Sequence, residues 1–228
     1  MNILSKQDIK EGGFAGLREH RFVMDSKVFG LRKEATASDG LGNCVYLADA
    51  YFNPHGETGM HPHKEVDVIS VMVEGRIAHE GSLEHGQVLK TGDVQVQRAG
   101  GEGFSHNEIN PDDTKNRMVQ LWVLPEAPGE AAAYKVYQPK ASAVTRIYGG
   151  SADQENCFPS QTVIEIIHLN QGDELELEEE GLTYITKGRV EVEEGFSHAE
   201  LQDGNLLHST EAKIKALSDS SLISIYKE

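Results

Sequence analysis

Short apolar segments separated by polar turns run along the whole chain. Most of these segments alternate or are rich in β-branched residues, which is typical of β-strands. The clearest are VDVISVMV, DVQVQ, MVQLWVL, TVIEIIHL, LTYIT, RVEVE and LISIY, with turn signals such as EGR, TGD, NQGD and KGR between them. Helical periodicity is scarce, and PGEAAAYKVY near residue 130 is expected to form a short helix or turn. The pattern predicts an all-β fold of sandwiches or barrels.

Two domains are expected, because residues 124–141 hold three of the seven prolines and an alanine run, as linkers do. We place an N-terminal domain at residues 1–130 and a C-terminal domain at residues 131–228. The halves follow a similar plan. EGRI at 74–77 resembles KGRV at 187–190, and TGDVQVQ at 91–97 resembles QDGNLLH at 202–208. The shared order and spacing indicate a duplicated β-domain.

The amino-acid composition and net charge indicate a folded domain and argue against some classes of partner. The 228 residues are 38% apolar, which fits a folded domain, and the net charge of −16 argues against direct binding to nucleic acid. No apolar run reaches the length of a membrane helix or a secretory signal, so we expect a cytoplasmic protein without membrane contact. The two cysteines, Cys44 and Cys157, are expected to be reduced thiols, since they are far apart and form no CxxC pair.

His61 and His63 are two residues apart in the sequence GMHPHKEVD. Residues two apart share a face of an extended segment, and Pro62 favours extended geometry for the residue before it. Both imidazoles should therefore project the same way. The simpler interpretation is that histidines near a turn are solvated or structural. The alternative interpretation is that His61 and His63 bind a metal, and a second motif supports it.

That second motif is His106 and Glu108 in AGGEGFSHNE, again two residues apart and preceded by a glycine-rich turn. If the two strands face each other across a barrel, three imidazoles and one carboxylate converge. Such a set suits a divalent first-row metal, namely Fe, Ni, Cu, Mn or Zn. The remaining histidines lack a partner at ligand spacing, and we interpret them as structural or exposed: His20, His55, His79, His85, His168, His198 and His208.

HPHKEVD, VEGRI, TGDVQVQRAGGEGFSHNE and VQLWVLP together resemble the pirin family of bicupins, most strongly over residues 55–125. The resemblance implies two cupin barrels (double-stranded β-helix or jelly roll) packed side by side, with one metal in the N-terminal barrel. It implies His61, His63, His106 and Glu108 as the ligands, and iron as the first expectation for the metal. Asp67 stands where general cupins often have a glutamate ligand, and we interpret it as a supporting or structural residue.

The duplication also bears on the second barrel. Counting from Gly75 and Gly188, and from Gly92 and Gly204, the four ligand positions correspond to Glu174, Glu176, Ser218 and Ser220. No histidine stands at any of them, so we predict a degenerate C-terminal barrel without a metal site.

Some pirins resemble quercetinases, which open the central ring of flavonols with dioxygen and release carbon monoxide. The sequence thus predicts a dioxygenase for a flavonol-like aromatic substrate, with Glu108 as the catalytic base. Phe52, Met60, Val71, Val73 and Phe104 are candidates for the substrate wall, although ordinary barrel packing explains each of them equally well. The alternatives are a non-catalytic redox sensor or transcriptional co-regulator that acts through a protein partner, and another cupin activity on a polar metabolite.

Overall fold

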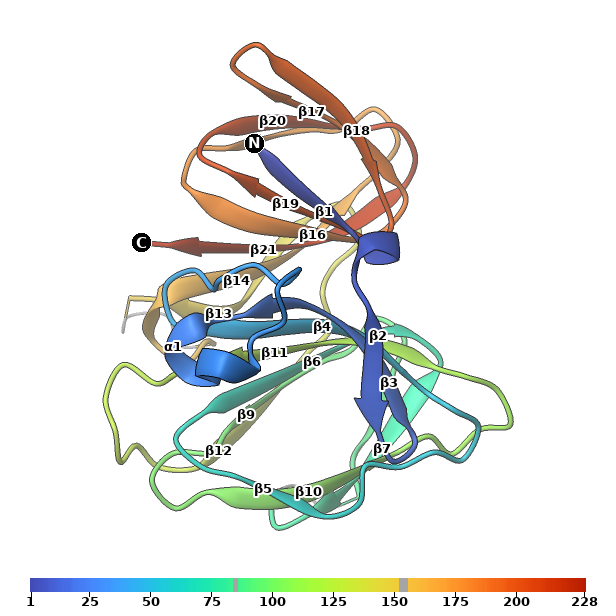
Figure 1. The fold of residues 1–228 in the computed structure, drawn as a ribbon, viewed down its shortest axis with the longest axis vertical. Helices are drawn as coiled ribbons and strands as arrows, with labels where there is room; N and C mark the ends of the chain where they lie inside the picture. The colour runs from blue at the N-terminus through green and yellow to red at the C-terminus, as the bar shows by residue number, and fades with distance from the viewer. Residues whose placement is uncertain (84–85, 152–155) are drawn as a thin grey trace. The chain divides into compact units, whose positions relative to one another are not determined.

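The computed structural model describes residues 1–83, 86–151 and 156–228, and nearly all of its regular structure is antiparallel β-sheet (Figure 1). Two compact units are present. We call residues 9–138 the N-terminal barrel, and residues 1–8 together with 139–228 the C-terminal barrel.

The N-terminal barrel consists of two antiparallel sheets. One has the order β12-β9-β6-β11-β4-β3-β2 and the other has the order β5-β10-β7-β8. The strands are β2 (Glu11–Phe14), β3 (Leu17–Met24), β4 (Cys44–Phe52), β5 (His61–His63), β6 (Asp67–Glu74), β7 (Arg76–Gly81), β8 (Val88–Lys90), β9 (Val94–Arg98), β10 (Phe104–Ile109), β11 (Arg117–Val123) and β12 (Ala133–Tyr137). A short helix, α1 (Ser26–Phe29), and a 3-10 turn, η2 (Gly30–Arg32), connect β3 to β4. Asp25 caps α1 by accepting a hydrogen bond from the Lys27 amide.

The C-terminal barrel repeats this plan with the sheets β1-β19-β16-β21-β14-β13 and β15-β20-β17-β18. Its elements are β1 (Asn2–Ser5), η1 (Lys6–Asp8), β13 (Val144–Gly150), β14 (Ser160–Leu169), β15 (Glu174–Leu177), β16 (Gly181–Lys187), β17 (Arg189–Glu194), β18 (Ser197–Gln202), β19 (Asn205–Ser209), β20 (Ala212–Ala216) and β21 (Ser220–Lys227).

Strand β20 shows how alternation in the sequence builds such a barrel. Ala212, Ile214 and Ala216 are buried, and the two lysines between them are exposed. Because successive side chains of a strand point to opposite faces, the apolar residues enter the core and the lysines remain in water. On the outside the lysines pair across the strands with glutamates of β15: Lys213 with Glu176, and Lys215 with Glu174.

The observed boundaries differ from the expected ones at both ends of the N-terminal half. Residues 2–5 form β1, which pairs with β19 of the C-terminal barrel. The segment expected to be a short helix or turn contains β12, which pairs with β9 and extends the N-terminal barrel to residue 138. Local sequence misled here because the alanine run favours helix, whereas an unpaired edge of β9 is available to Ala133–Tyr137. None of the helices in the described part of the chain has the length and hydropathy that a membrane crossing requires.

Candidate metal centre

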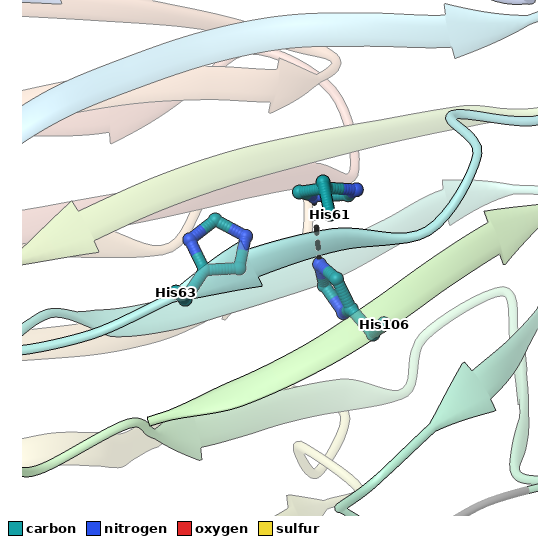
Figure 2. Close-up of side chains that lie close together, drawn as sticks. All are labelled: His61, His63 and His106. Atoms are coloured by element: carbon teal, nitrogen blue, oxygen red, sulfur yellow. Dashed lines mark hydrogen bonds between the residues drawn. The ribbon is translucent and has the colours of Figure 1, made fainter. Parts of the chain in front are cut away.

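Three of the four predicted ligands meet on the neighbouring strands β5 and β10 (Figure 2). His106 of β10 lies directly opposite His61 of β5, and His63 lies opposite Phe104. The two-residue spacing places His61 and His63 on one face, as the sequence predicted. The Nε2 atoms of His61 and His106 are 3.0 Å apart, and the ring of His63 lies 4.9 Å from that of His61 and 5.0 Å from that of His106.

The hydrogen bonds behind the rings indicate which nitrogens are free to bind. Nδ1 of His61 lies 2.9 Å from the Gly59 carbonyl oxygen, and Nδ1 of His106 lies 3.1 Å from Oε1 of Gln97. Since both partners accept, each neutral ring carries its proton on Nδ1 and presents a bare lone pair on Nε2. Nε2 of His63 is also buried and has no hydrogen-bond partner among the described residues. Three lone pairs that face one another repel unless a cation lies between them, so this trio fits a divalent metal.

Glu108, the fourth predicted ligand, forms a second group that overlaps the first. It lies two residues after His106 on β10 and directly opposite His79 of β7. Oε1 of Glu108 lies 3.2 Å from Nε2 of His79, and Gln120 Nε2 lies 3.3–3.4 Å from both carboxylate oxygens. The potential ligand atoms of His61, His63 and His106 lie within 4.8 Å of one another, and so do those of His79, His106 and Glu108. His106 thus belongs to both groups.

His79 is the residue that sequence reasoning missed. The structure buries it completely beside Glu108, whereas spacing within the sequence left it without a partner. A signal was present, because His79 lies two residues after the core residue Ile77 and therefore on the inward face of β7. The pairing with Glu108 is made across strands and cannot be read from local spacing.

The charge states of the cluster at neutral pH are those that metal binding requires. Burial lowers the pKa of His63 to about 4 and that of His106 to about 3, so both rings are neutral. Burial alone would raise the pKa of Glu108, but the hydrogen bond from His79 and the neighbouring imidazoles lower it to about 2. Neutral imidazoles and an ionised carboxylate need to lose no proton before they bind a cation.

A chain of buried amides holds these side chains from behind. Gln97, which fixes the orientation of His106, accepts a 2.8 Å hydrogen bond from Gln95 Nε2. Gln95 Nε2 also contacts Nε2 of His79 at 3.1 Å, but this nitrogen already donates to Glu108 and cannot accept from Gln95. Oε1 of Gln95 accepts a 2.9 Å bond from the Tyr134 hydroxyl. Hydrogen bonds of this kind set the tautomer and the direction of metal-binding imidazoles.

A pocket of about 570 Å³ opens in front of the histidines within the N-terminal barrel. One wall is a stack of three aromatic rings, in which Tyr46 lies 4.5 Å from Trp122 and 5.8 Å from Phe29. The lining also includes three cationic side chains and one further carboxylate: Arg21, Arg32, Lys64 and Glu19. Offset stacking on such a wall suits a flat aromatic ligand. Arg21 is paired with Glu19 and Glu34, so Arg32 and Lys64 are the cations that favour a ligand with negative charge.

None of the five apolar residues expected to form the substrate wall lines this pocket. Phe52 is buried in the barrel core, and Met60 is 59% exposed. Asp67 is structural, since its Oδ2 accepts a 3.1 Å bond from the buried Arg98.

The described histidines other than His61 and His63 lie outside the pocket lining. His55 is exposed and bonded to Asp113, and His198 is exposed. His85 lies outside the described residues.

Each unit is built from two antiparallel sheets, and the N-terminal barrel holds a histidine and carboxylate cluster at its centre. Fold and site together define a bicupin.

The comparisons with known proteins agree with the resemblance. The Pirin family model matches residues 23–123, so the resemblance to pirins that the sequence motifs predicted is confirmed. A Zymomonas mobilis protein, named provisionally as a quercetin 2,3-dioxygenase, is 29% identical over 73% of this chain and 74% of its own length.

Two solved structures share the fold. A bacterial pirin from Escherichia coli, in complex with nickel(II), superposes with a TM-score of 0.82 at 18% identity, covering 99% of this chain and 98% of that one. A quercetin 2,3-dioxygenase from Acinetobacter baumannii superposes with a TM-score of 0.72 at 18% identity, covering 100% of this chain and 86% of that one.

Proposed function

We propose that this protein is a metal-dependent dioxygenase that opens the ring of a flavonol-like substrate with O₂. The observation that carries the proposal is the convergence of three imidazoles, two of which, His61 and His63, line a pocket walled by stacked aromatic rings. Two relatives that carry the name quercetin 2,3-dioxygenase support the choice of substrate.

His61, His63, His106 and Glu108 would hold the cation, and iron is our first expectation, with Ni, Cu, Mn and Zn as alternatives. When bound, the cation would supply Lewis acidity that lowers the pKa of a coordinated hydroxyl. His79 also lies at this centre, where its hydrogen bond keeps Glu108 ionised and directed.

The pocket residues would bind and orient the substrate. The Phe29, Tyr46 and Trp122 rings would stack on the flat ring system, and the cations at the rim would favour the flavonolate anion over the neutral flavonol. Glu108 would accept the proton of the 3-hydroxyl. Because the pKa of Glu108 is about 2, that transfer requires a hydroxyl already made acidic. In the overall reaction both atoms of O₂ enter the products and carbon monoxide leaves.

The test combines metal analysis with a quercetin assay in air. We expect the purified protein to contain about one transition metal per chain and to consume quercetin, and we expect His106→Ala to lose both properties. His198→Ala is the matched control, because His198 is an exposed histidine outside the site. Full metal occupancy without turnover of any flavonoid in a panel would contradict the enzymatic proposal and favour a sensor that acts through a protein partner. Unchanged metal content in His106→Ala would contradict the ligand set.

A further inference from the structure

The C-terminal barrel has a pocket of its own, of about 360 Å³, and all of its lining residues belong to that barrel. Its apolar wall is made by Val144, Ile167, Leu175 and Leu177. The volume lies within the range of sites that bind small molecules.

Strand register shows that this pocket is the counterpart of the metal pocket. The chain turns from β6 to β7 at Gly75 and from β16 to β17 at Gly188, and both β6–β11 and β16–β21 have a bulge next to this turn. Beyond the bulge, Met118 pairs with Met72, and Leu222 pairs with Ile185. Two and four residues further along β11 and β21, Gln120 matches Ser224 and Trp122 matches Tyr226. All four of these residues line their respective pockets.

Aligning the two barrels at Gly75 and Gly188 also shows which residues stand at the positions of the metal ligands. Val192 lies four residues after Gly188, as His79 lies four after Gly75, and its partner across β20 is Ile214, where β10 has Glu108. Two residues earlier on these strands, Ala212 matches His106.

Leu177, which pairs with Ala212, matches His61, which pairs with His106. The positions differ from those that counting along the sequence indicated, because the loops before β10 and β20 have different lengths. The second pocket thus keeps its location. Leu177, Ala212 and Ile214 replace three of the ligands, whereas Glu179, two residues after Leu177, stands at the position of His63.

The second pocket differs from the metal pocket in the number of acidic side chains that line it. Five glutamates line the second one: Glu165, Glu176, Glu178, Glu179 and Glu228. Arg146 is shared by two of them, at 3.3 Å from Glu165 and 3.0 Å from Glu228, and it also donates to the Tyr226 hydroxyl at 3.0 Å. Lys213 pairs with Glu176 on the exposed side. Two carboxylates that share one guanidinium leave a negative charge at the mouth, and Glu178 and Glu179 add to it.

A polar group without a partner lies behind the lining of this pocket, on the same face of the sheet as Ser224. Thr183 is fully buried, and its hydroxyl has no hydrogen-bond partner among the described residues. It stands directly opposite Ser224 in the antiparallel pair, so both side chains point to the same face, and Ser224 lines the pocket. A buried hydroxyl without a partner costs free energy, so this face of the sheet is less completely paired than an ordinary core.

We propose that the C-terminal barrel binds a small organic cation with an apolar body, such as an arylalkylammonium ion. The apolar part would lie against Leu175, Leu177 and Ile167, and the ammonium group would lie among the glutamates near Tyr226. This site is independent of the metal centre and has the opposite charge preference.

The test uses titration calorimetry of the whole, metal-loaded protein with phenethylamine, and with 3-phenylpropionate as the anion of matched shape. We expect saturable 1:1 binding of phenethylamine and no detectable binding of 3-phenylpropionate. Glu165→Gln should weaken phenethylamine binding about tenfold, which corresponds to about 1.4 kcal/mol. Leu177→Trp, which fills the pocket, should abolish it.

Glu200→Gln is the control, because it removes an exposed carboxylate of the same barrel that pairs with Arg189 outside the pocket. It should bind phenethylamine like the unchanged protein, and quercetin turnover should stay unchanged in all three variants. Equal binding of the anion by the wild-type protein overturns the proposal even if Leu177→Trp does not fold. Unchanged binding in a folded Leu177→Trp protein, or no saturable binding of phenethylamine, would overturn it as well.

Discussion

At the scale of single residues, Gln97 decides whether His106 presents a lone pair to a metal. Its Oε1 accepts from Nδ1 of His106 at 3.1 Å, and the residue is buried. Gln97→Leu keeps the bulk and removes the acceptor, which frees the ring to change tautomer or rotate. We expect metal affinity to fall by about 10- to 100-fold. Competition with a chromophoric chelator measures this directly.

The control for this prediction is Gln138→Leu, which removes an exposed glutamine whose bond is to Asp93 on the surface of the same barrel. It should bind metal like the unchanged protein. If Gln97→Leu also binds metal normally while retaining its fold, the tautomer argument fails, and His106 must be held by the strand alone.

The lowered pKa values of the histidines also predict how stability depends on pH. In the unfolded chain an ordinary histidine protonates near pH 6.5, whereas His63 in the folded protein resists protonation down to about pH 4. As pH falls through this window, the unfolded state takes up protons that the folded state does not, so the metal-free protein loses stability. His63 should account for roughly 2 kcal/mol of this loss between pH 7 and pH 4.5.

Urea unfolding of metal-free protein across this range provides the measurement. His63→Leu should flatten the pH dependence by roughly that amount, whereas His55→Leu, at an exposed position, should leave it unchanged. Identical slopes for His63→Leu and the unchanged protein would show that His63 protonates at the same pH in the folded protein as in the unfolded chain.

The residues that could be predicted from sequence are those with a partner two positions away. His61 with His63, and His106 with Glu108, share a face because a strand repeats every two residues, so spacing alone placed each pair. His79, Gln95 and Gln97 act through contacts across strands, which depend on register. The aromatic wall of Phe29, Tyr46 and Trp122 was missed for the same reason, since its members come from α1, β4 and β11.

At the scale of elements, the close approach of β7 and β10 positions the site. Gly81 lies directly opposite His106, and a Cβ atom there would meet the Ser105 carbonyl oxygen at 2.3 Å and the Cα atom of His106 at 2.9 Å. These are backbone atoms, so Gly81→Ala must separate the strands. We expect this variant to lose most of its metal and to unfold at a lower temperature. Metal analysis and thermal unfolding measure the two effects.

Gly12→Ala is the matched control, because a Cβ at Gly12 meets only the end of the flexible Arg21 side chain, at 3.3 Å. It should keep its metal. Full metal content in Gly81→Ala would mean that β7 can move without disturbing His106.

Strands were the elements that sequence patterns identified best, and the exceptions have physical causes. Both β1 and β12 lie at sheet edges, where pairing with a neighbour decides the structure more than local pattern does. The segment of β12 contains an alanine run that favours helix, but its partner β9 offers a free edge. The β1 segment is short and its partner β19 lies about 200 positions away, so no local signal could assign it.

At the scale of the whole molecule, the two barrels share one topology and differ in what fills them. Duplication was visible in the sequence, because the turn glycines Gly75 and Gly92 recur in the same order as Gly188 and Gly204. The exact correspondence of positions was not, because loops of unequal length shift any count along the chain. Register places Leu177, Ala212 and Ile214 where the first barrel has His61, His106 and Glu108. A bound metal should therefore stabilise one unit only.

Calorimetry of the intact protein tests this consequence. If the two units unfold separately, the metal-free protein shows two transitions, and adding metal raises only the one that belongs to the N-terminal barrel. At a free metal concentration 100 times the dissociation constant, that barrel gains about 2.7 kcal/mol. His61→Ala should abolish the shift and leave the other transition in place. A shift of equal size in both transitions would mean that the second barrel also binds metal, through residues other than its aliphatic counterparts.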